Sequence, residues 1–165
     1  VKKITVGVLR AGAHLIAEPI ESKYNPQSIV DAQFSMPFGA SMAVLFGRAG
    51  LKEFQPSTIR SRPVREMMRK VECIVDPELE RTFHKQWRAT AEILTEDEKR
   101  YSTTIEYPKG DPENPLSWEE MIERFHDLTG QIIKKEQRLK IVSEVERLDG
   151  IKDMRRWSSQ FFRKE

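Results

Sequence analysis

The spacing of apolar and polar residues along the chain predicts four β-strands. In residues 2–10 the side chains alternate, with Ile4, Val6 and Val8 on one face, as expected for a central strand. Three further segments show strand character and complete the predicted set, which comprises residues 2–10, 71–75, 86–94 and 100–107. The polar connector 95–99 has the length of a hairpin loop, so the last two strands are predicted to be antiparallel neighbours.

The longest apolar run predicts a buried helix from about Ser35 to Gly47. Pro37 suits the first turn of a helix, and the Ser35 hydroxyl before it can accept a hydrogen bond from a free N–H group. Phe38 and Met42 recur at helical spacing and predict the buried side. Gly47 is a residue type that often ends helices.

Small residues four apart on the same helix predict a place of close approach. Gly39, Ala43 and Gly47 form a stripe without bulk, where we expect the backbone of another element to pack. Leucine at Gly39 or Ala43 is then expected to overpack this contact.

The other segments predict a loop and further helices. Gly12, Pro19 and Pro26 interrupt residues 11–29, which we expect to form a loop. Ser117 followed by Glu120 is typical of a capping box at the start of a helix. Further helices are predicted over 57–71, 118–128, 132–148 and 151–162. Together these elements predict an α+β fold, in which an antiparallel four-stranded sheet has helices packed on one face.

Two blocks of sequence resemble the MmgE/PrpD family. Residues 31–43, DAQFSMPFGASMA, look like the start of the central helix of that family's second domain. Residues 108–125, PKGDPENPLSWEEMIERF, resemble the segment that leads into a late helix. The resemblance covers roughly residues 1–150 and implies a chorismate-mutase-like α+β arrangement. It also implies that 1–165 is a single domain of the family's C-terminal type, without the helical N-terminal domain of the longer members.

The same resemblance implies a role in lyase or isomerase chemistry. The family includes 2-methylcitrate dehydratase, cis-aconitate decarboxylase and iminodisuccinate epimerase, which abstract a proton beside a carboxylate. Its members are expected to need no metal and no organic cofactor. Their proton-transferring residues come mostly from the helical domain, so no residue of this chain is assigned a catalytic role. The expected role is a lid over a cleft for di- or tricarboxylic acids, closed against a helical domain or subunit and inactive alone.

The substrate-binding candidates lie at the start of the central helix and in one loop. A helix N-terminus presents free N–H groups that favour a carboxylate, and the resemblance places Phe34, Ser35 and Phe38 there. The family often has tyrosine at Phe38, so the hydrogen bond of that hydroxyl is missing here. A plain core helix is the alternative. Lys109 in the proline-rich loop is a weaker candidate, and a rigid connector is its alternative.

Composition narrows the classes of partner. The chain has 165 residues, of which 38% are hydrophobic and 33% charged, and its net charge of +2 does not suggest a nucleic-acid partner. The longest apolar run is too short to span a membrane. Cys73 is the single cysteine, so we expect no internal disulfide and a cytoplasmic location. His14, His84 and His126 lack metal-ligand spacing. A non-catalytic module that docks a partner protein, or a homo-oligomer, remains an alternative.

Overall fold

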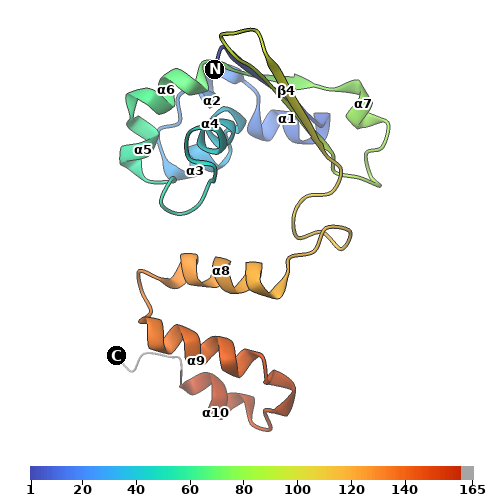
Figure 1. Ribbon diagram of the computed structural model, residues 1–165. Helices are drawn as coiled ribbons and strands as arrows, with labels where there is room; N and C mark the ends of the chain where they lie inside the picture. Colours follow the sequence, from blue (N-terminus) through green and yellow to red (C-terminus); the bar gives the residue numbers. More distant parts are fainter. Residues whose placement is uncertain (161–165) are drawn as a thin grey trace. The chain divides into compact units, whose positions relative to one another are not determined.

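A computed structural model describes residues 1–160 of the chain, and Figure 1 shows its elements. The described residues form two compact units. The first spans Val1–Pro115, and the second begins at Leu116. The sheet and all of the predicted site residues belong to the first unit.

The first unit contains a four-stranded sheet in the order β2-β1-β3-β4. Its strands are β1 (Lys3–Val8), β2 (Val71–Val75), β3 (Ala89–Leu94) and β4 (Arg100–Ile105). The sequence predicted a strand at each of these four places. Strand β3 runs antiparallel to both of its neighbours, pairing Ile4 with Ile93 on one side and Ile93 with Tyr101 on the other. The α+β fold is therefore confirmed.

The sheet is mixed, so the expectation of a wholly antiparallel sheet is wrong in one pair. Strands β1 and β2 run parallel, with Ile4 opposite Val71 and Val8 opposite Val75. The helices between them return the chain to the end of the sheet where β1 began, which makes the second strand parallel to the first. The periodicity within a strand carries no information about its direction.

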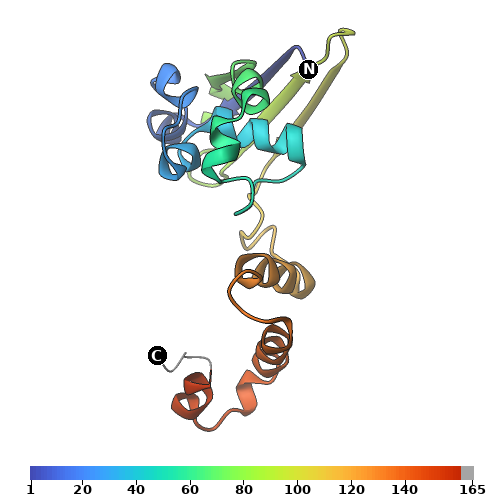
Figure 2. The same cartoon turned by 90° about the vertical axis from the view of Figure 1, so that its left-hand side faces the viewer.

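Helices cover one face of this sheet, as predicted. The helices of the first unit are α1 (Arg10–Ile16), α2 (Ile20–Lys23), α3 (Ile29–Gln33), α4 (Met36–Phe46), α5 (Pro56–Arg60), α6 (Arg62–Met68) and α7 (Pro77–Glu80). Figure 2 shows α1 to α6 gathered on one side of the sheet. Ile4, Val6 and Val8 of β1 are buried in a cluster with Ala13 of α1 and Val71 of β2. Burying these side chains holds the two layers together.

Gly7 of β1 lies where the opposite strand leaves no room for a side chain. Its partner across the β1–β3 pair is Thr90. A Cβ atom at Gly7 would collide with the Thr90 Oγ1 atom and would lie 3.3 Å from the Cβ atom of Asp76. The packing therefore favours glycine at this position.

The segment 11–29 is mostly helical, so the expectation of a loop there is wrong. It contains most of α1, all of α2 and the first residue of α3. Leu9, Ala13 and Ala17 are buried at a spacing of four, which is a helical pattern that Gly12 obscured. Ser28 and Asp31 form a capping box at the start of α3. Asp in the third position of that box is a weaker sequence signal than Glu or Gln.

The predicted central helix is confirmed as α4. Ser35 is its N-cap, and Gly47 ends it with a left-handed φ of 68°, a conformation that glycine adopts without strain. Its buried side carries Phe38 and Met42, which are both 0% exposed, and packs against α6 and β2. The helix therefore contacts both the sheet and the helical layer.

The small-residue stripe on α4 does not pack against another element in the first unit. A Cβ atom added at Gly39 or Gly47 would have no atom within 4 Å, and Ala43 is exposed. The predicted close contact is therefore wrong within the described residues. Residues four apart do share one side of α4, but the buried side is the one that carries the bulky Phe38 and Met42.

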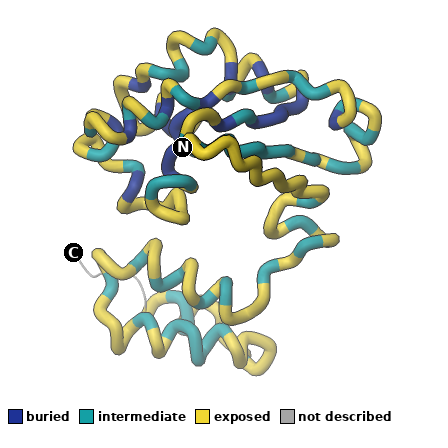
Figure 3. The backbone as a smooth tube through the Cα atoms, turned by 45° about the horizontal axis from the view of Figure 1, so that its top comes forward, coloured by how far each residue is buried: buried dark blue, intermediate teal, exposed yellow. Residues whose placement is uncertain are grey.

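A second cluster of buried residues lies among the helices. Phe38 and Met42 of α4 pack there with Ile59 of α5 and with Val64 and Met68 of α6. Figure 3 shows that the buried positions concentrate in the helices and in β1, whereas β4 is exposed along its length. The core of the first unit thus lies between β1–β2 and the helices.

The second unit consists of short helices. They are α8 (Trp118–Thr129), α9 (Lys135–Val145), a 3₁₀ turn (Leu148–Gly150) and α10 (Met154–Ser159). The predicted capping box at Ser117 and Glu120 is present at the start of α8. The helices α9 and α10 are shorter than the predicted 132–148 and 151–162. Residues 161 and 162 of the latter prediction lie outside the described part of the chain.

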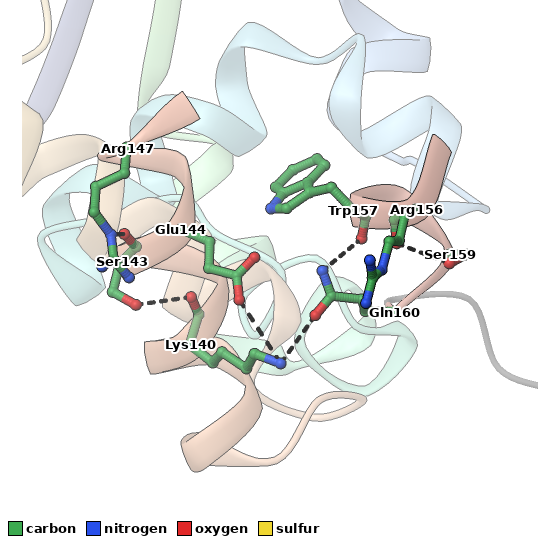
Figure 4. Close-up of polar contacts among 8 residues, drawn as sticks. All are labelled: Lys140, Ser143, Glu144, Arg147, Arg156, Trp157, Ser159 and Gln160. Atoms are coloured by element: carbon green, nitrogen blue, oxygen red, sulfur yellow. Dashed lines mark hydrogen bonds and ion pairs between the residues drawn. The ribbon is translucent and has the colours of Figure 1, made fainter. Parts of the chain in front are cut away.

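Polar contacts tie α9 to the end of α10. The Lys140 ammonium donates to the Gln160 Oε1 atom at 3.0 Å and lies 3.7 Å from the Glu144 carboxylate, as Figure 4 shows. Gln160 in turn donates to the Trp157 carbonyl at 3.0 Å. Within 116–160 no residue is buried. The second unit therefore contributes no enclosed core of its own in the described structure.

Candidate functional site

The predicted site at the start of α4 is built by two consecutive helix caps. Ser28 and Asp31 open α3, which ends at Gln33 with Phe34 as its C-cap. The next residue, Ser35, caps α4. The local sequence thus ends one helix and begins the next, which places Phe34 and Ser35 at the corner between α3 and α4. Phe38 follows one turn into α4.

The Ser35 hydroxyl makes two hydrogen bonds within the fold. Its oxygen accepts a hydrogen bond from the Phe38 N–H at 3.1 Å, and its O–H donates one to the Lys23 carbonyl at 2.6 Å. Ser35 is 3% exposed. Because Pro37 has no N–H and that of Phe38 is bonded to Ser35, the helix start has little capacity left to bind an anion. Ser35 therefore positions α4 and has no hydroxyl group available for a substrate.

The two phenylalanines of the predicted site have opposite environments. Phe38 is 0% exposed, and its ring lies 5.0 Å from that of Phe54 in the helical cluster. Phe34 is 42% exposed at the corner between α3 and α4. Of the three residues predicted here, Phe34 alone presents a side chain that an outside molecule can contact.

Lys109 lies in a different part of the first unit, in the loop after β4. This loop is closed by a hydrogen bond from the Gly110 N–H to the Asn114 carbonyl at 2.8 Å. Gly110 adopts a φ of 108°, which favours glycine. The Lys109 residue is exposed. The structure thus joins Phe34, Ser35 and Phe38 at one corner and places Lys109 on a separate loop.

A buried carboxylate that the sequence patterns did not indicate lies in the loop after α4. Glu53 is 6% exposed, accepts a hydrogen bond from the Gly50 N–H at 2.8 Å and holds the Arg48 guanidinium at 3.0 Å. The Gly50 hydrogen bond, followed by that of Arg48, keeps the pKa of Glu53 below its ordinary value. The available signal in the sequence for this contact was a pair of opposite charges five residues apart, in a loop flanked by glycines. The pair fixes the loop, and Arg48 remains half exposed.

Cations gather around an open cavity of about 450 Å³ at the ends of β1 and β2. It is lined by Lys2, Lys3, Arg69 and Lys70 together with Tyr24, Val71, Glu72 and Leu94. The lysines already contact carboxylates of the chain, since Lys2 pairs with Glu98 and Lys3 lies 2.6 Å from Glu72. These contacts neutralise much of the positive charge that an anionic ligand would need.

Cys73 and His14 are two further side chains of the first unit with reactive groups. Burial raises the pKa of the Cys73 thiol to about 11, so the thiol is protonated and a weak nucleophile at neutral pH. The His14 Nδ1 atom lies 2.6 Å from the Glu18 carboxylate, one turn away on an exposed surface. Among residues 1–160 no three His, Cys, Asp or Glu side chains are grouped so that they could hold a metal ion.

Comparison with protein families decides how this architecture is classified. Residues 1–149 match the model of the MmgE/PrpD C-terminal domain. The chain belongs to the MmgE/PrpD family. The suspected resemblance is therefore confirmed, and the match extends over the first unit and through α8 and α9 of the second. No curated protein matches the chain. We also find no helix in residues 1–160 with the length and apolar character needed to cross a bilayer.

Proposed function

We propose that this MmgE/PrpD C-terminal domain is the lid of an enzyme that acts on di- or tricarboxylic acids. The observation that carries the proposal is the family match over residues 1–149. The lid closes against a helical domain or subunit that supplies the proton-transferring groups. Closure excludes water and positions the substrate for removal of a proton beside a carboxylate.

The two exposed residues among the predicted site residues have different proposed roles. Phe34, which is 42% exposed, provides an apolar contact to the carbon chain of the substrate or to the helical partner. Lys109, on its exposed loop, attracts the carboxylates. Ser35 and Phe38 act indirectly, because the cap and the buried ring hold the corner that presents Phe34.

Reconstitution with a helical domain tests the proposal. The chain is mixed with the helical domain of a family enzyme. Dehydratase, decarboxylase and epimerase activities are then assayed on citrate-like and aconitate-like acids. We expect no turnover from either part alone and turnover from the mixture. Turnover by the isolated chain would contradict the lid role, because a complete site would then lie within it.

Matched variants separate a substrate contact from a general effect. In the reconstituted enzyme, Phe34→Ala is expected to raise KM, whereas Phe46→Ala, at the other end of α4 and 51% exposed, is expected to leave KM unchanged. Phe38→Ala is expected to slow catalysis together with a loss of stability, because it opens a cavity in the core. A complex that forms without turnover would favour the alternative, a module for assembly.

A further inference from the structure

The strand β4 ends the sheet and is open along its outer side. In the order β2-β1-β3-β4 it has one neighbour, and each residue from Arg100 to Ile105 is exposed. The apolar side chains of Tyr101 and Ile105 are 59% and 48% exposed. Natural edge strands are often blunted by proline, by a bulge or by inward-facing charge. The regular pairing of β4 with β3 includes no bulge.

The hydrogen-bond pattern identifies which backbone groups of β4 face outward. The Thr95 N–H donates to the Lys99 carbonyl at 3.0 Å, so these residues form a hydrogen-bonded pair at the hairpin end. In an antiparallel ladder such pairs recur at every second residue. Tyr101, Thr103 and Ile105 therefore bond to β3, and the N–H and C=O groups of Arg100, Ser102 and Thr104 point away from the sheet.

We propose that β4 pairs with the β4 strand of a second copy of this chain, around a two-fold axis at Thr103. In this antiparallel register Ser102 lies opposite Thr104 of the other copy, and their outward backbone groups exchange hydrogen bonds. Tyr101 then lies opposite Ile105, a favourable pair of an aromatic and a β-branched side chain. Arg100, which also forms an ion pair with Glu92 of its own chain, lies opposite Glu106, the first residue after β4, so opposite charges meet at both ends of the interface.

The register of the proposed strand pair follows from two features: the backbone groups of every second residue face outward, and the segment carries one charge near each end. Only residues whose backbone groups face outward can form the hydrogen-bonded pairs, which restricts the axis to few positions. An axis at Ser102 would place Arg100 opposite Thr104 and leave Glu106 unmatched. The axis at Thr103 matches the positive and the negative residue of the segment with each other. This self-complementarity makes a second copy the occupant that the strand fits best. The inference does not depend on the proposed enzymatic function.

A pair of charge-reversal variants tests the dimer with the full chain. In Arg100→Glu, two glutamates face each other at each end of the interface, and in Glu106→Arg two arginines do. Sedimentation at low salt should show that each variant self-associates about tenfold more weakly than the unmodified chain. A mixture of the two variants should form heterodimers with the original affinity, because a glutamate of one copy then faces an arginine of the other at each end.

A control and a second measurement keep the test decisive. Glu78→Arg, a reversal of an exposed charge on α7, should leave self-association unchanged. In the unmodified chain the amide hydrogens of Ser102 and Thr104 should exchange more slowly as protein concentration rises, and Thr104→Pro should abolish the association. A monomer at about 1 mM, a dimer indifferent to these variants, or exchange independent of concentration would overturn the proposal. These readouts need no substrate and no helical partner, so they are separate from the test of the lid role.

Discussion

Replacing Ser35 by alanine removes two hydrogen bonds at the corner that presents Phe34. The Phe38 N–H loses its acceptor at 3.1 Å, and the Lys23 carbonyl loses its donor at 2.6 Å. Ser35 is 3% exposed, so water does not readily replace either partner. If Ser35 instead served mainly to bind a ligand, its removal would leave the stability of the free chain unchanged.

The magnitude follows from the two contacts. Loss of a serine N-cap costs about 1 kcal/mol. Loss of a second hydrogen bond in a buried site costs about another 1 kcal/mol. We therefore expect Ser35→Ala to lower the free energy of unfolding of the first unit by about 2 kcal/mol.

Ser41 provides a matched control on the same helix. It is 0% exposed, and its hydroxyl donates to the Pro37 carbonyl at 2.7 Å. That carbonyl lies within the helical ladder, and alanine is the better helix former, so Ser41→Ala is expected to change stability by less than about 0.5 kcal/mol.

Urea unfolding of the full chain, followed by circular dichroism, measures both variants. Hydrogen exchange of the α4 peptide then locates the effect, and we expect faster exchange in Ser35→Ala. A neutral Ser35→Ala, or equal losses in the two serine variants, would refute the view that this hydroxyl is committed to the fold.

Three further predictions concern the sheet, the central helix and the loop after it. Gly39→Ala should stabilise the chain by about 1 kcal/mol in thermal unfolding, because its Cβ atom meets open space; a loss would restore the close contact first expected. Gly7→Ala should cost about 1–3 kcal/mol, and Thr90→Ala in the same chain should recover part of it, a coupling that a double-mutant cycle measures. Since the fold lowers the pKa of Glu53, the stability due to its charge is present above the unfolded pKa and lost as pH falls through the folded one. The free energy of unfolding of Glu53→Gln should therefore be lower than that of the unmodified chain near neutral pH, and the two values should converge in acid. A difference that stays constant with pH would contradict the assignment.

Elements specified by nearby residues could be predicted from the sequence. The cap at Ser35, the stop at Gly47 and the capping box at Ser117 each depend on residues within one helical turn, and all three are present. The alternation in β1 also located the strand and its buried face. Short α1 escaped prediction because Gly12 interrupts its apolar spacing, although Ala13 is 1% exposed.

Features set by distant residues could not be predicted in the same way. The parallel pairing of β1 with β2 depends on where the intervening helices return the chain. The open side of Gly39 depends on which elements surround α4. At the candidate site, Phe34 and Phe38 are close in sequence, but only the packing shows that one ring is exposed and the other fully buried. Their roles as substrate contact and positioning residue stay predictions.

The hydroxyl of Tyr24 has a consequence for how far any assembly of this sheet can grow. It donates to the Val71 carbonyl of β2 at 2.6 Å. The Ile4 N–H bonds to the Lys70 carbonyl, so the next carbonyl along β2 faces away from the sheet, and Tyr24 occupies it. A sheet with two receptive borders can add chains without limit and form fibres, whereas one with a single receptive border closes after two. Tyr24→Phe would free the Val71 carbonyl. Concentrated protein of this variant would then tend to form open-ended polymers.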